Sequence, residues 1–330
     1  MKILIVKLDR IGDYILFRNF LKPLREKYKN AEITFIGNES YKKIVEEYDE
    51  KYLNKTFFAN QEKFWKNMDY REELFKKVNT KYDLILHPTY SRVFEVDKFI
   101  SRLNSKEKIT FKGNAVNQKK SQKESLDEIY NLLIETNKIH EFDKYKDFFE
   151  IFLKEDLKEI KLKLEYFKKN PTLKYVVLMC GSTSKFKEYS PKKLTELTNF
   201  IAKKYNYNIH VCGIKKDSKI ANKIINKSKA DIFNSIDCFN LEELIDLIGN
   251  AEFVITMDSC GTHIAVATNT PVICLSSGIF YGRFVPYPKR YKRIKVLVPP
   301  FYFKNFHGLI NLIKVKDIER SIIKQMGEEK

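Results

Sequence analysis

The chain has 330 residues, 43% of them hydrophobic, and a formal net charge of +18, and this length suits two domains rather than one. No apolar run is long enough to cross a membrane, and the first apolar segment is too short for a secretory signal, so we expect a cytoplasmic protein. The five cysteines are odd in number and have no Cys-x-x-Cys spacing, which argues against a disulfide framework or a zinc site.

The first half alternates strand and helix patterns. Strands are predicted at 2–7, 32–37, 83–87 and 108–111, and helices at 13–28, 40–48, 70–78 and 124–138. A charged, helical stretch over 145–169 then ends at Asn170-Pro171. Because the residue before a proline is disfavoured in a helix, we place a domain boundary there.

The second half repeats the alternation. Strands are predicted at 175–180, 208–213, 231–234, 253–256 and 271–276, and helices at 217–227, 240–249, 316–326 and from Pro191 onward. Strands that alternate with helices predict parallel sheets. We therefore expect an α/β protein with domains at 1–169 and 170–314. A final helix at 315–330 is expected to pack back on the first domain.

Three predicted turns carry polar residues directly after a strand. The first contains Gly12 and Asp13, and Asp13 is either a helix cap or a carboxylate that faces a cleft. The second is Gly181-Ser-Thr-Ser-Lys-Phe-Lys187, which is followed by a helix start at Pro191. The third is Asp258-Ser-Cys-Gly-Thr-His263 before an Ala-rich helix. A strand, a small-residue turn and a helix N-terminus make an anion site in α/β proteins, whereas the alternative for Asp258 is an ordinary N-cap.

Lys7 with Gly12-Asp13, the loop up to Lys187, and Asp258-Ser-x-x-x-His263 resemble glycosyltransferase family 9 in type and order. This family includes the ADP-heptose:lipopolysaccharide heptosyltransferases, and the resemblance spans residues 1 to about 290. It implies the GT-B architecture, in which two Rossmann-like parallel-sheet domains face a cleft. One departure is that family members usually have Gly two residues after the signature Asp, where this chain has Cys260. This difference leaves the donor sugar open.

A nucleotide-sugar donor requires groups that hold a diphosphate. The sequence has no Asp-x-Asp motif for a metal, so we expect no metal and no cofactor. Phosphate contacts are predicted from Ser182, Thr183, Ser184 and Lys187, and from Gly261, Thr262 and His263, the last being either a ligand or a loop support. The resemblance implies that Asp258 binds the donor sugar and that Gly213 and Asp217 bind the ribose. Phe239 is either a wall for the base or core, and Arg283 is placed to reach the donor.

The acceptor must lose a proton as it attacks the anomeric carbon. The resemblance places Asp13 as the general base for direct displacement with inversion. Lys7 and Gly12 are expected to support Asp13 or the acceptor. Tyr90 and Arg92 follow the predicted strand at 83–87 and are candidates to hold an anionic or sugar acceptor.

Three functions compete at this point. The first is a metal-independent inverting glycosyltransferase that builds a bacterial lipopolysaccharide core or another surface glycan. The second is another GT-B enzyme, either a transferase with a different nucleotide sugar or an epimerase. The third is a basic nucleic-acid-binding protein, which the interleaving of Lys with Glu disfavours. The charge instead predicts weak attraction to an anionic glycolipid or to the inner face of the inner membrane.

Overall fold

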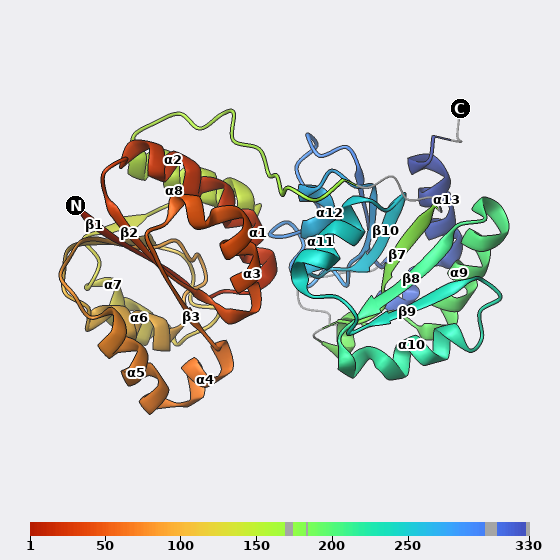
Figure 1. Ribbon diagram of the computed structural model, residues 1–330, viewed down its shortest axis with the longest axis horizontal. Coiled ribbons are helices and arrows are strands. Elements are labelled where there is room, and N and C mark those ends of the chain that lie inside the picture. Colours follow the sequence, from red (N-terminus) through yellow and green to blue (C-terminus); the bar gives the residue numbers. More distant parts are fainter. Residues whose placement is uncertain (169–173, 183, 301–308, 328–330) are drawn as a thin grey trace. The chain divides into compact units, whose positions relative to one another are not determined.

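The computed structural model describes residues 1–168, 174–182, 184–300 and 309–327 (Figure 1). A six-stranded parallel sheet organises the first part of the chain. The chain divides into two units, Met1–Lys161 and Leu162–Lys330. The boundary predicted at 169–170, with Asn170-Pro171, lies outside the described residues.

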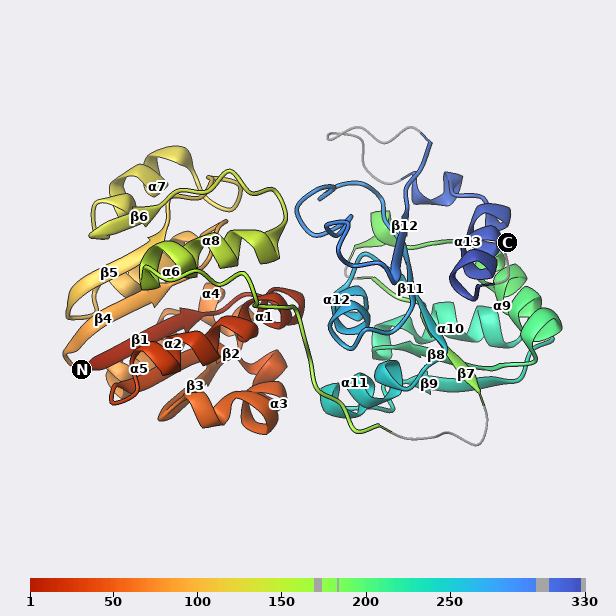
Figure 2. The same ribbon diagram turned by 90° about the horizontal axis from the view of Figure 1, so that it is seen from above.

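The first sheet has the strand order β3-β2-β1-β4-β5-β6, and all of its neighbouring strands are parallel. Its strands are β1 (Lys2–Lys7), β2 (Glu32–Asn38), β3 (Lys55–Ala59), β4 (Tyr82–His87), β5 (Ser105–Phe111) and β6 (Leu132–Ile134). Its helices are α1 (Ile11–Phe17), α2 (Leu21–Lys27), α3 (Lys42–Ile44), α4 (Gln61–Lys66), α5 (Met68–Val78), α6 (Phe94–Ser101), α7 (Lys120–Asp127) and α8 (Glu141–Leu153). Helices α1, α2 and α8 cover one face, and α5, α6 and α7 cover the other (Figures 1 and 2).

Three predicted helices differ from the structure. Within its described residues, the helical stretch expected over 145–169 is helical only to Leu153, where α8 ends. The helix expected at 124–138 ends at Asp127, and Leu132–Ile134 joins the sheet as β6, where Ile134 is buried. This short apolar run therefore forms the edge strand of the sheet and is not part of a helix. The helix expected at 13–28 is divided by a 3-10 turn at Arg18–Phe20. Pro23 follows this turn and has no N–H with which to continue the hydrogen-bond ladder.

The second sheet has the strand order β12-β11-β10-β7-β8-β9 and is also parallel throughout. Its strands are β7 (Tyr175–Met179), β8 (Asn208–Gly213), β9 (Ile232–Ile236), β10 (Phe253–Met257), β11 (Val272–Leu275) and β12 (Ile294–Leu297). Its helices are α9 (Pro191–Tyr205), α10 (Ser218–Ile225), α11 (Leu241–Gly249), α12 (Cys260–Ala267) and α13 (Val315–Gln325). Helices α9, α10 and α13 lie on one face, and α11 and α12 lie on the other (Figure 1).

The final helix α13 belongs to the core of the second unit. Its apolar side chains Ile318 and Ile322 are buried in the core of the second unit, together with Leu194 and Leu197 of α9. The apolar stripe of the final helix therefore covers the second sheet, and its packing on the first domain stays a prediction. The predicted class of fold, two Rossmann-like parallel-sheet domains of the GT-B type, is confirmed.

Both sheets have the same internal order, in which the chain starts in the middle, runs to one edge, and returns to build the other half. In such doubly wound sheets ligands bind at the carboxyl ends of the two strands where the order reverses. These strands are β1 and β4 in the first unit and β7 and β10 in the second. The predicted site residues are concentrated in the segments that follow these four strands.

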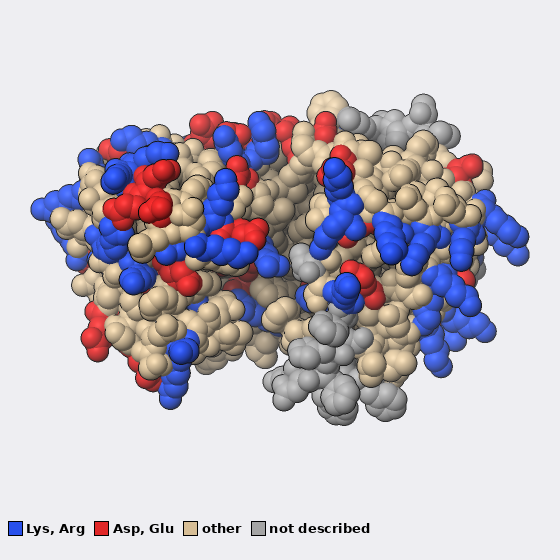
Figure 3. Space-filling view, turned by 90° about the horizontal axis from the view of Figure 1, so that it is seen from below, with Lys and Arg blue, Asp and Glu red and all other residues tan. Residues whose placement is uncertain are grey.

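Lysine and arginine side chains are spread over the surface among carboxylates (Figure 3). Several lysines pair with a glutamate one helical turn away, namely Lys22 with Glu26, Lys42 with Glu46, Lys66 with Glu62, and Lys120 with Glu124. Among the described residues, no helix combines the length and apolar character needed to span a bilayer.

Candidate functional site

The loop after β7 is held by the neighbouring turn after β8. Ser182 is buried, and its carbonyl oxygen accepts a hydrogen bond from Lys216 Nζ at 2.8 Å. The Ser184 N–H lies 3.4 Å from Ser182 Oγ, and a 3-10 turn at Lys185–Lys187 follows. Thr183, predicted as a phosphate ligand, lies outside the described residues. The anchored loop is thus followed at once by the 3-10 turn that carries Lys187.

Lys187 and Asp258 meet at the carboxyl edge of the second sheet. Lys187 Nζ lies 3.6 Å from Asp258 Oδ2, and the two side chains are 12% and 5% exposed. Asp258 Oδ2 has no hydrogen-bond partner among the described residues. Burial raises the pKa of Asp258, and the charge of Lys187 counters only part of this effect. Two residues that the sequence places 71 positions apart therefore form an incompletely satisfied ion pair.

The start of α12 presents backbone rather than side-chain groups. Its N-cap is Ser259, which makes no side-chain cap hydrogen bond, so the alternative of Asp258 as N-cap is wrong. Gly261 packs closely, because a Cβ there would lie 3.1 Å from Met179 Cγ and 3.2 Å from Thr256 Oγ1. The Thr262 hydroxyl donates to the Met257 carbonyl at 3.2 Å, and its N–H donates to the Ser259 carbonyl at 3.1 Å. Thr262 therefore supports the turn.

His263 also supports the structure around this turn. Its Nδ1 lies 2.5 Å from the hydroxyl oxygen of Tyr287, and both side chains are buried. Arg283 belongs to the same segment and stacks on Phe284 at 4.8 Å. Its N–H donates to the Phe280 carbonyl, and the Phe280 ring lies 4.8 Å from Lys187 Nζ. The segment after β11 thus contacts the phosphate-loop lysine through Phe280.

Asp217 is placed differently from a simple ribose ligand. It is 5% exposed, and its Oδ2 accepts a hydrogen bond from the Ile214 N–H at 3.0 Å. Gly181 has no room for a Cβ because the Asp217 carboxylate occupies that space, and Gly213 is similarly close. Asp217 therefore joins the ends of β7 and β8, and its contact with a ribose stays a prediction. Phe239 is 37% exposed, which favours a surface wall over core.

In the first unit, Lys7 is fully buried at the end of β1. Its Nζ donates hydrogen bonds to Asp9 Oδ2 at 2.5 Å, to Tyr145 Oη at 2.6 Å, and to the Pro88 carbonyl at 3.1 Å. Lys7 therefore acts on Asp9 and on the segment after β4 and exposes no surface to an acceptor.

Asp13 lies in the first turn of α1 and is partly exposed, next to Gly12. The N-cap of α1 is Arg10, so the interpretation of Asp13 as the cap is wrong. The following residue, Tyr14, is buried, and its hydroxyl donates to Asp49 Oδ2 at 2.6 Å. This anchor sets the rotation of α1 and leaves Asp13 at the carboxyl edge of the sheet.

Arg92 is fully buried and forms ion pairs with Asp97 and Asp127. Tyr130 stacks under its guanidinium at 5.0 Å and donates to Asp97 Oδ1. The prediction that Arg92 contacts the acceptor directly is therefore not supported by its position, because its charge is neutralised inside the unit. Tyr90 is partly exposed, and Lys144 Nζ lies 3.9 Å from its ring centroid.

The sequence profile described as glycosyltransferase family 9 (heptosyltransferase) matches residues 101–298. The chain belongs to glycosyltransferase family 9. It is 25% identical over 292 residues to lipopolysaccharide heptosyltransferase 1 of Campylobacter coli, and the match covers 83% of each chain. The protein is therefore a glycosyltransferase.

Two solved structures share the fold of this family 9 transferase over nearly its whole length. The glycosyl transferase family 9 protein from Veillonella parvula has a TM-score of 0.79 at 15% identity and covers 99% of this chain and 98% of its own. The heptosyltransferase WaaC from E. coli, solved with ADP-2-deoxy-2-fluoro heptose, has a TM-score of 0.75 at 16% identity and covers 98% and 99%.

Sequence reasoning missed two residues of the candidate site of this family 9 transferase. Asp9 lies two residues after the end of β1 and is the partner of Lys7, and Phe280 contacts Lys187. The signal for Asp9 was present, since a carboxylate within two residues of the end of a buried strand lies at the sheet edge. Phe280 had no such signal. Among the described residues, no group of three or more His, Cys, Asp or Glu side chains is arranged to hold a metal ion.

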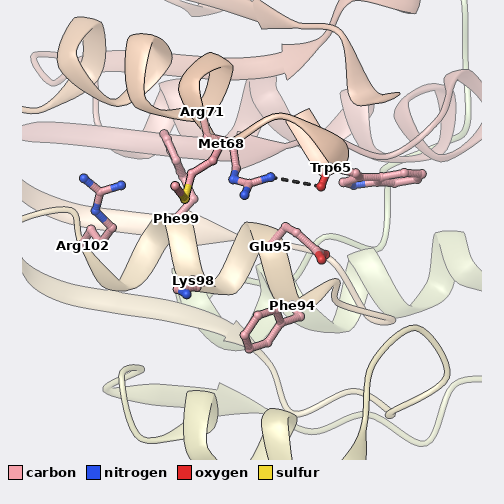
Figure 4. Close-up of a pocket in the computed structure, with 8 residues that line it drawn as sticks. All are labelled: Trp65, Met68, Arg71, Phe94, Glu95, Lys98, Phe99 and Arg102. Carbon is pink, nitrogen blue, oxygen red and sulfur yellow. Dashed lines mark hydrogen bonds between the residues drawn. The ribbon is translucent and has the colours of Figure 1, made fainter. Parts of the chain in front are cut away.

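A separate hollow lies between α4, α5 and α6 of the transferase's first unit and is lined by Trp65, Met68, Phe94 and Phe99 (Figure 4). The arginines around it are already engaged. Arg71 donates to the carbonyls of Phe64 and Trp65, and Arg102 pairs with Glu72 at 2.8 Å. We interpret this hollow as a consequence of helix packing.

Proposed function

We propose that the enzyme transfers a heptose-like sugar, with inversion and without a metal, from an ADP-linked donor to a lipopolysaccharide core or another surface glycan. The observation that carries the proposal is the Lys187–Asp258 pair at the carboxyl edge of the second sheet, in a chain that belongs to family 9. The similar E. coli enzyme was solved with an ADP-heptose analogue, which supports the donor. The similarity to the lipopolysaccharide heptosyltransferase of Campylobacter coli supports the acceptor.

The donor diphosphate would bind where the loop at 181–187 and the start of α12 converge on β7 and β10. In this proposal Lys187 neutralises the negative charge that develops on the leaving diphosphate, and the backbone N–H groups of the first turn of α12 add partial positive charge. Asp258 would accept hydrogen bonds from the hydroxyls of the donor sugar. Its unpartnered Oδ2 supports this role, because a buried carboxylate oxygen requires donors.

Asp13 would act as the general base. As the acceptor oxygen attacks the anomeric carbon, its proton passes to the Asp13 carboxylate, and the bond from that carbon to the diphosphate oxygen breaks on the opposite face. One base and no covalent intermediate are sufficient for inversion. The partly exposed position of Asp13 at the start of α1 supports this assignment.

We also propose that the enzyme works at the cytoplasmic face of the inner membrane, held weakly by its charge of +18. Each well-placed lysine contributes about 1 kcal/mol at an anionic surface. Sedimentation with vesicles that contain phosphatidylglycerol tests this placement. Binding that is lost at high salt supports it, and equal binding to neutral vesicles contradicts it.

Thermal stabilisation by ADP-, UDP-, GDP- and CMP-linked sugars, measured with and without EDTA, tests the donor. A ligand at 100 times its dissociation constant adds roughly 2.7 kcal/mol to the free energy of unfolding. Stabilisation by ADP-heptose that EDTA does not change is the expected result. Stabilisation by another nucleotide alone would contradict the ADP-linked donor while keeping the transferase, and no stabilisation by any nucleotide would overturn the donor site.

A further inference from the structure

The charge of Lys7 is used entirely within the first unit. An ammonium group has three N–H bonds, and those of Lys7 go to Asp9, Pro88 and Tyr145. The group is also within 4.6 Å of the centroid of the Tyr145 ring. Arg92, the other cation predicted to hold the acceptor, is neutralised by Asp97 and Asp127. Neither cation can therefore serve as the contact for an anionic acceptor group at the ends of β1 and β4.

Asp9 presents the opposite charge at this edge, and its geometry is asymmetric. Oδ2 receives hydrogen bonds from Lys7 Nζ at 2.5 Å and from Thr89 Oγ1 at 2.7 Å. Within the described parts of the chain, no hydrogen bond reaches Oδ1, and the side chain is 22% exposed. One oxygen is thus fixed and the other is left to accept a hydrogen bond from outside the protein.

The backbone around Asp9 is fixed as well. Asn38 Nδ2 donates to the Asp9 carbonyl at 3.1 Å, and Gln61 Nε2 donates to the Leu8 carbonyl at 2.7 Å. The hydroxyl of the buried Tyr41 donates to the Lys7 carbonyl. A carboxylate held from both its side chain and its backbone loses little entropy when it binds a ligand, as a substrate-positioning group requires.

We propose that Asp9 binds a hydroxyl of the acceptor sugar through Oδ1, so that the acceptor at this edge is an uncharged polyol rather than an anionic group. The inference rests on the proposed function, because it names the acceptor chemistry of the same reaction. A carboxylate oxygen accepts a strong, charge-assisted hydrogen bond from a neutral hydroxyl, whereas ionised phosphate and carboxylate groups have no proton to donate to it. Lys7 and Thr89 are positioning residues that hold Asp9, and any anionic groups of the acceptor bind elsewhere.

The test is the Asp9→Asn variant of the full chain, with Asp69→Asn as the control. Asp69 is an exposed carboxylate in the first turn of α5, so the control removes the same charge. In Asp9→Asn the amide oxygen can keep the hydrogen bonds from Lys7 and Thr89, which preserves the fold. The amide N–H2 then replaces Oδ1 and cannot accept from a hydroxyl. With a deacylated core oligosaccharide as acceptor, we expect KM for the acceptor to rise roughly tenfold to hundredfold and KM for the donor to be unchanged.

Acceptor analogues that each lack one hydroxyl sharpen this test. For one of these analogues, KM with the wild type should be raised by the same factor as KM for the intact acceptor is raised in Asp9→Asn. With that analogue, Asp9→Asn should cause no further rise in KM. Thr89→Val should show a smaller rise in KM for the acceptor. Thr89→Ser, which keeps the hydroxyl, should have a KM close to that of the wild type. Asp9→Asn values equal to those of Asp69→Asn would overturn the proposal, and so would a fall in kcat with an unchanged KM for the acceptor.

The proposed function can fail separately. If the wild type transfers no sugar from any nucleotide donor, the function is wrong, and Asp9 is then judged by equilibrium binding of neutral oligosaccharides and their phosphorylated counterparts. Weaker binding of neutral sugars to Asp9→Asn than to the wild type supports the role of Asp9. Equal binding to both proteins, no binding to either, or a wild-type preference for the phosphorylated sugars overturns it.

Discussion

Lys187 Nζ lies 3.6 Å from Asp258 Oδ2 at the carboxyl edge of the second sheet, too far for a hydrogen bond and close enough for an ion pair. The carboxylate oxygen has no hydrogen-bond partner among the described residues, and the ammonium nitrogen lies 4.8 Å from the centroid of the Phe280 ring. A largely shielded cation beside a buried, incompletely bonded carboxylate is arranged for a ligand that carries phosphate oxygens and hydroxyls.

Lys187→Ala should abolish most of the stabilisation by the donor. A hydrogen bond between charged groups contributes about 1.5–3 kcal/mol, so the dissociation constant for ADP should rise roughly tenfold to hundredfold, as isothermal titration measures. Lys185→Ala is the matched control, because Lys185 belongs to the same 3-10 turn and is exposed. An equal loss of ADP affinity in the two variants would show that Lys187 contributes only general surface charge.

Asp258→Asn should stabilise the protein without ligand and remove donor binding. Because burial raises the pKa of Asp258 in the folded state, its stabilising contribution exists at low pH and is lost as pH rises through that pKa. At neutral pH the ionised carboxylate therefore costs stability, which the neutral amide avoids. We expect a gain on the order of 1 kcal/mol in urea unfolding at pH 7. A loss of stability at pH 7 would show that the ion pair with Lys187 outweighs burial.

The turns of the candidate site could be predicted from the sequence, because each is a local pattern. Gly12-Asp13 follows β1, the loop to Lys187 follows β7, and Asp258 follows β10, as the alternation of strands and helices predicted. Side-chain partners were beyond this reasoning. Lys7 bonds to Pro88 and Tyr145, which are 81 and 138 residues away. Nothing near Lys7 in the sequence indicates that its ammonium group makes all of its hydrogen bonds inside the protein.

Arg92 was predicted as an acceptor ligand for the same reason. Its position after a strand is a local feature, whereas its neutralisation depends on Asp127, which is 35 residues away. Asp217 is a similar case in one respect. Its bond to the Ile214 N–H is local, but its fit against Gly181 arises from the pairing of β7 with β8. The sequence therefore indicated which segments form the candidate site, and tertiary contacts decided which side chains in them are available.

Arg92→Met tests the structural role of this arginine. Removing one partner from a buried ion pair leaves an uncompensated charge and costs about 3–5 kcal/mol. Arg102→Met is the control, because Arg102 pairs with Glu72 at the surface, where both side chains are more than one third exposed, and an exposed pair contributes at most about 1 kcal/mol. Urea unfolding measures both. Unchanged stability in Arg92→Met, with weaker acceptor binding, would restore the role predicted from the sequence.

His87 should make the protein less stable in mild acid. Its Nδ1 donates to the Val6 carbonyl at 3.0 Å, and burial lowers its pKa below 6.5 despite the nearby Asp97. As pH falls below about 6.5, the unfolded chain binds a proton that the folded chain does not, so the free energy of unfolding decreases. Tm measured between pH 7.5 and 5.5 should fall, and it should fall less in His87→Asn. A parallel decline in the two proteins would contradict this origin.

Transfer of heptose in EDTA tests the account most directly. The full chain is incubated with ADP-heptose and a deacylated lipopolysaccharide core, and NMR determines the anomeric configuration of the product. We predict transfer with inversion at an unchanged rate in EDTA, and a rate lower by roughly 10²–10⁴ in Asp13→Asn with donor binding intact. A product with retained configuration, transfer that stops in EDTA, or full activity in Asp13→Asn would contradict the account.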